Sequence, residues 1–408
     1  GQTLREADWK VTAVLEMATW ISPEGPPRLI DLLPGDRTDS SWGVAVDIGT
    51  TSNVVYLVDL LTGKVVDAAA DYNAQIARGE DVISRIVYAQ REGGREELQS
   101  LVVGTINGLL EQVAKRQGIA PTAIHKMTVA GNITMVHLFL RLSPASIRLT
   151  PYIPTLNYPQ PVLAGSLGLA IHPRATVDCL PGVGSYVGAD ITAGVLSSGL
   201  YKADKLTLFV DIGTNGEMVL GNSDWFISCA CSAGPAFEGA GVEHGMRATE
   251  GAIEEVWIDG RTYEPTYRTI GNKAPLGICG SGLITLIAEM FITRVVDRSG
   301  NVRLDLDTAR VRQGSHGAWA EETARGRDIT ISDVDIANLI RAKAAVRAGL
   351  SVLALSLGLD LSMVEEFHIG GAFGQHLNIE KSVEIGLLPD LAWERFHFLG
   401  NTSVKGAY

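Results

Sequence analysis

The pentapeptide Val-Asp-Ile-Gly-Thr occurs twice in this chain of 408 residues, at residues 46–50 and again at residues 210–214. Each copy ends a short apolar run and is followed by small polar residues and a second apolar run. Short apolar runs bounded by turn residues predict buried strands joined by hairpins. The fold must therefore contain the same strand–turn–strand unit twice.

The similarity between the two halves extends beyond the pentapeptide. Three strands, then helices, then a further strand are expected in each half. In the first half these are strands at 43–49, 53–60, 64–72 and 123–132, with helices at 80–93, 95–118 and 133–142. In the second they are strands at 205–213, 217–222, 225–234 and 364–374, with helices at 280–296 and 332–358. A duplicated α/β unit of roughly 150–200 residues accounts for this pattern.

The duplication suggests a division of the chain. Residues 1–41 are rich in Pro, Gly and Asp and read as a linker or the end of an upstream module. We expect one domain at 42–200 and a second at 201–408. The stretch 143–181 is rich in proline and has little periodicity, so we expect an irregular insertion there.

The first repeat predicts a phosphate-binding turn. A buried strand places Asp47 at its carboxyl end, where open α/β sheets bind ligands. Gly49 permits a tight turn and close backbone approach, and Thr50 and Thr51 offer N–H and hydroxyl donors to an anion. Because a carboxylate repels a bare phosphate, a Mg²⁺ ion with its waters is expected between them.

The second repeat offers the same groups in the same order: Asp211, Gly213, Thr214 and Asn215. Two such hairpins facing each other across a cleft would grip a polyphosphate from both sides. Asp47 and Asp211 are then the expected Mg²⁺ residues, acting through water.

Two further glycine clusters are candidates for nucleotide contacts. Gly370 and Gly371 follow a predicted strand and permit backbone approach to a flat ring or a ribose. Gly280 and Ser281 open a predicted helix, where free N–H groups bind anions. A tight strand-to-helix turn without any ligand explains this second cluster equally well.

Polar residues near the expected cleft complete the candidate site. Asp190, Glu217 and Glu238 are candidates for orienting water or Mg²⁺, although each also fits an N-cap or an ion pair. Lys343 lies in an apolar-rich helix and is a candidate nucleotide contact, although a solvated helix face also explains it. The histidines have no spacing typical of metal ligands, and core or surface roles are expected for each.

Composition excludes several classes of partner. The net charge is −12 without a basic cluster, whereas nucleic acids and anionic membranes attract clustered Lys and Arg. Four cysteines are too few for a disulfide framework in a chain of this size. No uncharged apolar run reaches the length of a membrane span. We therefore expect a cytoplasmic protein that binds neither nucleic acid nor membrane.

Paired Asp-Ile-Gly-Thr hairpins with a later Gly-Gly-Ala resemble the ASKHA superfamily of acetate and sugar kinases, heat-shock chaperone ATPases and actin. The resemblance covers Gly43 to about Gly374. It implies an α/β fold with two ribonuclease-H-like domains flanking a cleft that holds ATP and Mg²⁺.

A denser set of strings resembles the reductive activators of corrinoid proteins. They include DVISRI, VAGNITMVHL, VGADITAG, SAGPAFEGAGVEHGMRATEGAI, GICGSGLI, IRAKAAVRAG and GNTSVKGA. The resemblance implies an ATPase that couples ATP binding and hydrolysis to reduction of Co(II) to Co(I) in the corrinoid protein of a methyltransferase system. It also implies a homodimer.

One departure from that family concerns the iron–sulfur module. Family members carry an N-terminal ferredoxin-like domain with a four-cysteine 2Fe–2S cluster, and this chain has no such set of cysteines. We therefore expect the chain to be the ATPase part of a longer protein. Two alternatives stay open: a small-molecule kinase of the same superfamily, in which Asp190 or another acid is the base, and a nucleotide-gated assembly protein.

Overall fold

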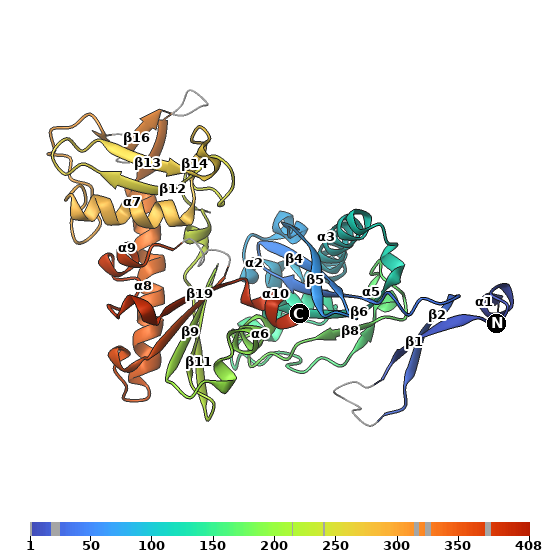
Figure 1. The fold of residues 1–408 in the computed structure, drawn as a ribbon. Coiled ribbons are helices and arrows are strands. Elements are labelled where there is room, and N and C mark those ends of the chain that lie inside the picture. Colours follow the sequence, from blue (N-terminus) through green and yellow to red (C-terminus); the bar gives the residue numbers. More distant parts are fainter. Residues whose placement is uncertain are drawn as a thin grey trace. The chain divides into compact units, whose positions relative to one another are not determined.

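The computed structural model describes residues 2–17, 25–213, 215–239, 241–313, 318–322, 328–371 and 377–408. The chain forms two compact units, Gly1–Ser197 with Thr402–Tyr408, and Ser198–Asn401. Each unit is built on a central sheet with helices packed against it (Figure 1). Among the described residues, no helix has both the length and the hydropathy needed to cross a membrane.

The first unit contains a six-stranded sheet with the strand order β5-β4-β3-β6-β8-β7. Its strands are β3 (Trp42–Ile48), β4 (Ser52–Asp59), β5 (Lys64–Tyr72), β6 (Ile124–Gly131), β7 (Val162–Leu163) and β8 (Thr176–Cys179). Its helices are α1 (Gln2–Glu6), α2 (Val82–Tyr88), α3 (Gly94–Gln117), α4 (Ile133–Phe139), α5 (Ala164–Leu167), α6 (Ala189–Ser198) and α10 (Thr402–Ala407).

Alternation along β3 decides which residues reach each face of this sheet. Val44, Val46 and Ile48 point into the core beneath α3. Ala45 points the other way and packs with residues of α6 and α10. Asp47, two positions further, therefore belongs to the face that α10 covers.

A two-stranded sheet of β1 (Val11–Glu16) and β2 (Arg28–Pro34) precedes the central sheet. Glu16 attaches it to the central sheet: its carboxylate accepts hydrogen bonds from Lys126 Nζ at 2.9 Å and Thr176 Oγ1 at 2.8 Å, and within the small sheet from Arg28 Nη2 at 2.8 Å. Burial alone raises the pKa of Glu16, but these donors outweigh burial and lower it. Residues 11–16 and 28–34 are thus strands in a segment where a linker or the end of an upstream module was expected.

The second unit repeats the topology in a five-stranded sheet with the order β11-β10-β9-β18-β19. Its strands are β9 (Thr207–Ile212), β10 (Gly216–Gly221), β11 (Phe226–Cys231), β18 (Glu366–Gly370) and β19 (Phe396–Gly400). In both units two antiparallel pairs are followed by two parallel pairs. The prediction of a duplicated α/β unit is confirmed.

Two smaller sheets and three helices complete the second unit. The strands are β12 (Ala252–Ile258), β13 (Pro265–Thr269), β14 (Gly277–Ile278), β15 (Val311–Arg312), β16 (Ala318–Glu322) and β17 (Asp328–Ser332). The helices are α7 (Gly280–Ile292), α8 (Asp333–Leu355) and α9 (Ile379–Glu384). Ser332 caps α8 in a capping box with Asp335, as its sequence position predicts.

Two segments differ from the division expected from the sequence. The stretch 143–181 contains β8, which pairs in parallel with β6 inside the central sheet. Four residues are too few to show a period of two, so no pattern in the sequence indicated this strand. The segment Thr402–Tyr408 lies in the first unit, although the sequence division grouped it with residues 201–401.

Candidate functional site

The turn between β3 and β4 is held from the protein interior by its carbonyl groups. Asn73 donates from Nδ2 to Gly49 O at 2.9 Å and from its backbone N–H to Thr51 O at 3.0 Å. Arg85 Nη2 donates to Thr50 O at 2.5 Å. Three consecutive carbonyl oxygens are thus engaged by two residues that follow the hairpin in sequence.

This arrangement orients the N–H groups of the turn. In a trans peptide the N–H points opposite to the C=O. The N–H groups of Thr50 and Thr51 therefore point away from the donors that hold the carbonyl oxygens of the preceding residues. A Cβ added at Gly49 would lie 2.5 Å from Ser52 O, so the tight turn requires glycine. The turn has the polarity that an anion site needs.

Arg85 is fully buried behind this turn, with 0% of its surface exposed. Its guanidinium also donates to Gly79 O at 2.9 Å and to Gln75 Oε1 at 3.2 Å. Burial lowers its pKa to about 10, so it stays charged at neutral pH. In the part of the chain that the structure describes, no carboxylate forms an ion pair with it. The charge of Asp81 opposes this pKa shift only in part, and a positive charge close to the turn favours an anion there.

Asp47 is held by the last helix of the chain. Ser403 Oγ, in α10, donates to Asp47 Oδ1 at 2.7 Å. Tyr56 lies close enough for Asp47 to affect it: burial raises the pKa of the Tyr56 hydroxyl, and the Asp47 charge raises it further. Asp47 is therefore a fixed, half-buried carboxylate beside the turn.

A second support comes from the start of α4. Asn132 caps this helix by accepting from Met135 N, and its Nδ2 donates to Thr50 Oγ1 at 2.9 Å. A Cβ at Gly188 would lie 2.6 Å from Asn132 Cα, so the segment before α6 packs directly on this cap. Asp190, in the first turn of α6, follows Gly188 by two residues.

In the second unit, two carboxylates and a glycine meet at the end of β9. Asp211 lies directly opposite Glu217 in the β9–β10 ladder, which puts both side chains on one face about 5 Å apart at Cβ. Gly370 pairs with Asp211 from the other side. Gly371 has a φ of +88°, and a Cβ there would lie 2.8 Å from Asp211 Oδ1. Adjacent carboxylates repel each other, and a divalent cation between them removes the repulsion.

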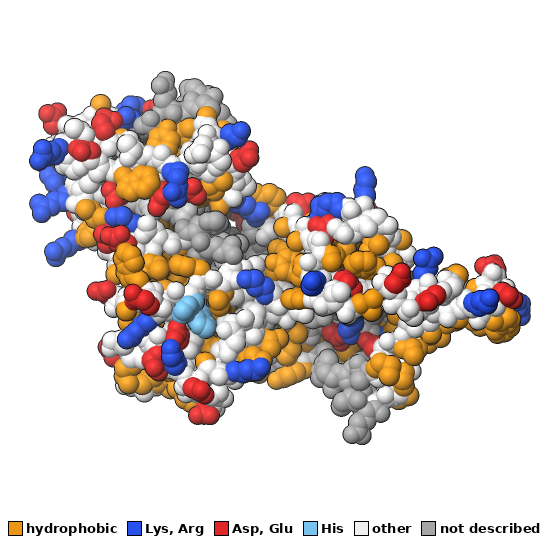
Figure 2. All heavy atoms as spheres, viewed as in Figure 1, with side chains coloured by type: hydrophobic (Ala, Val, Ile, Leu, Met, Phe, Trp, Pro, Cys, Tyr) orange, Lys and Arg blue, Asp and Glu red, His pale blue; other side chains and the backbone are white. Residues whose placement is uncertain are grey.

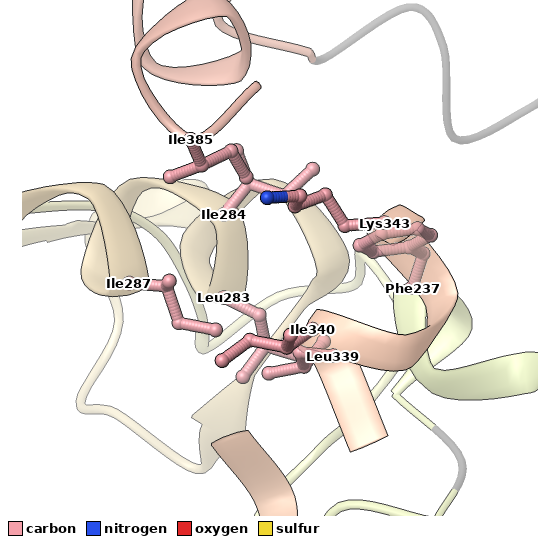
Figure 3. A pocket seen from close by; sticks show the side chains of 8 residues that line it. All are labelled: Phe237, Leu283, Ile284, Ile287, Leu339, Ile340, Lys343 and Ile385. Carbon is pink, nitrogen blue, oxygen red and sulfur yellow. The ribbon is translucent and has the colours of Figure 1, made fainter. Parts of the chain in front are cut away.

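A small apolar pocket that opens to solvent lies in the same unit (Figure 3). Its side chains come from α7, α8, the 235–238 turn and the end of α9. They are Phe237, Leu283, Ile284, Ile287, Leu339, Ile340, Lys343 and Ile385. Such a lining suits a planar apolar ring.

Lys343 supplies the cationic group of this pocket. A Cβ at Gly386 would lie 3.8 Å from its Nζ, so the ammonium group lies over the backbone that follows α9. Burial, and secondarily the charge of Arg347, lowers the pKa of Lys343. The pocket thus combines apolar walls with one partly desolvated cation.

The Gly-Ile-Cys-Gly-Ser-Gly cluster has a packing role. A Cβ at Gly277 would lie 2.7 Å from His244 O, and one at Gly282 would lie 2.1 Å from Ile253 O. Gly280 and Ser281 begin α7 and are buried. The close contact between α7 and β12 accounts for Gly282, while nucleotide contact by Gly280 and Ser281 stays a prediction.

Comparison with known families identifies the chain. A family model described as the RACo middle region matches residues 42–203. A second, described as the C-terminal domain of RACo, the ASKHA domain, matches residues 205–408, which is half of the chain. The chain belongs to the RACo family. The ASKHA fold class predicted from the paired hairpins is thereby confirmed, and this fold implies nucleotide binding.

Similar proteins carry related names. A corrinoid activation enzyme, RamQ, from Eubacterium limosum is 36% identical over 396 residues, covering 93% of this chain and 66% of that protein. A Co(II) methylated amine-specific corrinoid protein reductase from Methanosarcina barkeri is 24% identical, covering 89% of this chain and 68% of that protein. A solved reductive activator for corrinoid, iron–sulfur protein is 44% identical with a TM-score of 0.90, covering 100% of this chain and 65% of its own. This chain spans about two thirds of the length of these RACo relatives.

The structure sorts the predicted site residues into two groups, one in each unit. Asp47, Gly49, Thr50, Thr51 and Asp190 lie in the first unit. Asp211, Gly213, Asn215, Glu217, Gly280, Ser281, Lys343, Gly370 and Gly371 lie in the second. Thr214 and the side chain of Glu238 fall outside the described residues. The two-sided grip on one polyphosphate stays a prediction.

Sequence reasoning missed the residues that hold the first turn. Asn73, Arg85, Asn132 and Ser403 each bond to a residue of the Asp47–Thr51 segment. The only signals available were an arginine inside an apolar helix and an asparagine directly before one. Neither of these sequence signals indicates which turn the arginine or asparagine side chain contacts.

Proposed function

We propose that this chain is the nucleotide-dependent part of a reductive activator that returns a corrinoid protein from Co(II) to Co(I). Membership of the RACo family and the names of its relatives support the corrinoid protein of a methyltransferase system as the partner. The observation that carries the nucleotide-dependent part is the juxtaposition of Asp211, Glu217 and Gly371 in the unit that also holds the apolar pocket.

We assign the nucleotide groups to residues by their chemistry. The side chains of Phe237, Ile284 and Ile340 offer an apolar surface for the base, and Lys343 offers a cation for an anionic or carbonyl oxygen. Gly371 leaves room for a phosphate or ribose beside Asp211, because any side chain there would press on that carboxylate.

We assign Mg²⁺ binding and the orientation of water to the acidic side chains. MgATP, when bound, supplies a hydrolysable phosphoanhydride bond. Asp211 and Glu217 present two carboxylates on one face, which suits a hydrated Mg²⁺ and an oriented water molecule. Asp47, fixed by Ser403, offers a third carboxylate beside the donors of the first turn. Asp190 remains the fourth candidate acid.

The nucleotide acts on cobalt reduction through binding energy. A nucleotide shifts an equilibrium only by the difference in its affinity for the two states. The reduction potential of a one-electron couple shifts by about 59 mV for each tenfold change in the ratio of the affinities for its two oxidation states. We propose that the ATP-bound chain binds the corrinoid protein in a form in which Co(II) accepts an electron more readily. The resemblance assigns delivery of that electron to a ferredoxin-like module.

ATP hydrolysis by this chain, measured with and without a Co(II) corrinoid protein, tests the proposal. We expect hydrolysis that depends on Mg²⁺ and is stimulated by the Co(II) form more than by the methylated Co(III) form. Asp211→Asn should abolish turnover, while Asp259→Asn, in an exposed turn, should leave it unchanged. Corrinoid-independent phosphoryl transfer to a small metabolite would instead establish the kinase alternative.

A further inference from the structure

Three side chains with metal-binding atoms meet on the outer part of the second unit's sheet. Glu366, His368 and His397 each offer a ligand atom, and these atoms all lie within 4.8 Å of one another. They belong to β18 and β19 and are not among the residues assigned above to the nucleotide. Figure 2 shows histidine, acidic and basic side chains side by side at the surface of this unit.

The sheet register brings them together. Glu366 and His368 are two residues apart on β18 and therefore share a face of the sheet. His397 of β19 lies directly opposite His368 in the parallel ladder. The intervening pair, Phe367 and Phe396, points into the core. Burial of these phenylalanines fixes the register, so the three polar side chains are held on the opposite face.

Two of these side chains already form a hydrogen bond with each other. His397 Nε2 and Glu366 Oε2 are 2.5 Å apart, and the other carboxylate oxygen of Glu366 pairs with Lys205 Nζ. The rings of His368 and His397 meet edge to face with centroids 5.3 Å apart. His368 Nδ1 is buried without a hydrogen-bond partner among the described residues. A buried ring nitrogen without a partner is costly unless something occupies it.

We propose that Glu366, His368 and His397 bind a divalent transition-metal ion of the Zn²⁺ type. Two imidazoles and one carboxylate are a donor set that zinc, cobalt and nickel accept, and three protein ligands leave a position for water. Tetrahedral bonds of about 2.0–2.1 Å separate ligand atoms by about 3.4 Å, so small side-chain rotations close the site. The metal takes the place of the direct contact between His397 Nε2 and Glu366 Oε2, while Lys205 stays on the other carboxylate oxygen.

The position of Lys205 gives the proposal a specific test, because the Lys205 charge and the ligands should affect metal affinity in opposite directions. Its ammonium group lowers the metal affinity through like-charge repulsion without occupying Glu366 Oε2. Removing this charge should therefore tighten metal binding, whereas removing a ligand should weaken it. If the cluster is only an ion-pair network, neither the loss of the Lys205 charge nor the loss of a ligand should alter the affinity for metal.

The site is tested in the absence of nucleotide by titrating ZnCl₂ into the chelator-treated chain and measuring the heat of binding by calorimetry. We expect one bound equivalent and proton release. His397→Ala and Glu366→Gln should each weaken binding at least about tenfold. Lys205→Met should strengthen binding. Glu365→Gln, the same charge change at the neighbouring carboxylate, should change nothing. Unchanged affinity in His397→Ala would overturn the proposal.

Co²⁺ absorption provides the second readout. His/carboxylate ligation gives visible d–d bands without the near-ultraviolet thiolate band that Cys229 or Cys231 would add. A thiolate band would place the metal elsewhere and refute the assignment. The His397 side chain is 44% exposed, so its truncation should leave the fold intact, as circular dichroism can verify. Because no nucleotide is present, this result is independent of the ATPase test.

Discussion

Ser403 and Asp47 are joined by a 2.7 Å hydrogen bond although 356 positions separate them in the sequence. Ser403 belongs to α10, which packs with α6 against β3 and β6. The end of the chain thus reaches the carboxylate that the first repeat presents. The docked helix α10 therefore contributes to the orientation of Asp47.

Replacing Ser403 by Ala should weaken Mg²⁺-dependent nucleotide binding several-fold, because Asp47 loses the donor that orients it. The free energy of unfolding should fall by about 1 kcal/mol, as expected for one hydrogen bond. Ser197→Ala is the matched control, since Ser197 Oγ also anchors α10, at Thr402 O, 2.9 Å away. If both variants bind nucleotide equally, Ser403 only docks the helix.

Gly371→Ala should abolish nucleotide turnover. The added methyl group would lie 2.8 Å from Asp211 Oδ1, and the φ of +88° adds strain. Gly358→Ala is the control, because its φ is +67° but its Cβ would meet nothing within 4 Å. Gly358→Ala should lose about 1 kcal/mol of stability from backbone strain, and Gly371→Ala should lose more, because its Cβ would also lie 2.7 Å from Ile212 O. Near-normal ATPase activity in Gly371→Ala would contradict the assignment.

Lys343→Met should stabilise the fold while weakening nucleotide binding by about tenfold, a loss of ~1.4 kcal/mol. Burial lowers the pKa of Lys343, so its charged form is less favourable in the folded state than in the unfolded state. Its contribution to stability should therefore increase as pH rises through the folded pKa. Thermal unfolding and nucleotide titration measure the two effects, with the exposed Arg341→Met as control. A loss of stability would contradict the expectation.

Arg85→Lys should destabilise the first unit by about 3 kcal/mol, because a lysine cannot reach Thr50 O, Gly79 O and Gln75 together. Nucleotide affinity should fall as well, since the Thr50 carbonyl loses its partner. Urea unfolding measures the first effect and nucleotide titration the second. Arg91→Lys, at an arginine stacked over Tyr88, should have neither effect.

The β1–β2 sheet should detach in acid. The donors around Glu16 lower its pKa despite burial, so its stabilising contribution is present above the unfolded value of 4.5 and is lost as pH falls through the lower folded value. Hydrogen exchange in residues 11–16 should therefore accelerate at low pH. Glu16→Gln should show fast exchange already at neutral pH. Equal protection in variant and wild type would show that other contacts hold the sheet.

Local features of the sequence predicted most elements of both units. The strand expected at 64–72 is β5, residue for residue, and Ser332 caps α8 as expected. These features depend on neighbours in the chain: apolar period, turn residues and caps. The sequence did not predict strand β8, because four residues without alternation show no hydrophobic period.

Sequence alone determined the repeated strand–turn–strand unit and the acids and glycines at its turns, because these follow from short-range patterns. Only the tertiary structure decided which distant side chains complete them. Parallel pairing of β18 with β19 puts His397 beside His368, 29 residues after it, and α10 returns Ser403 to Asp47. Register and helix docking are set by burial of apolar residues over the whole chain, and no local pattern records their outcome.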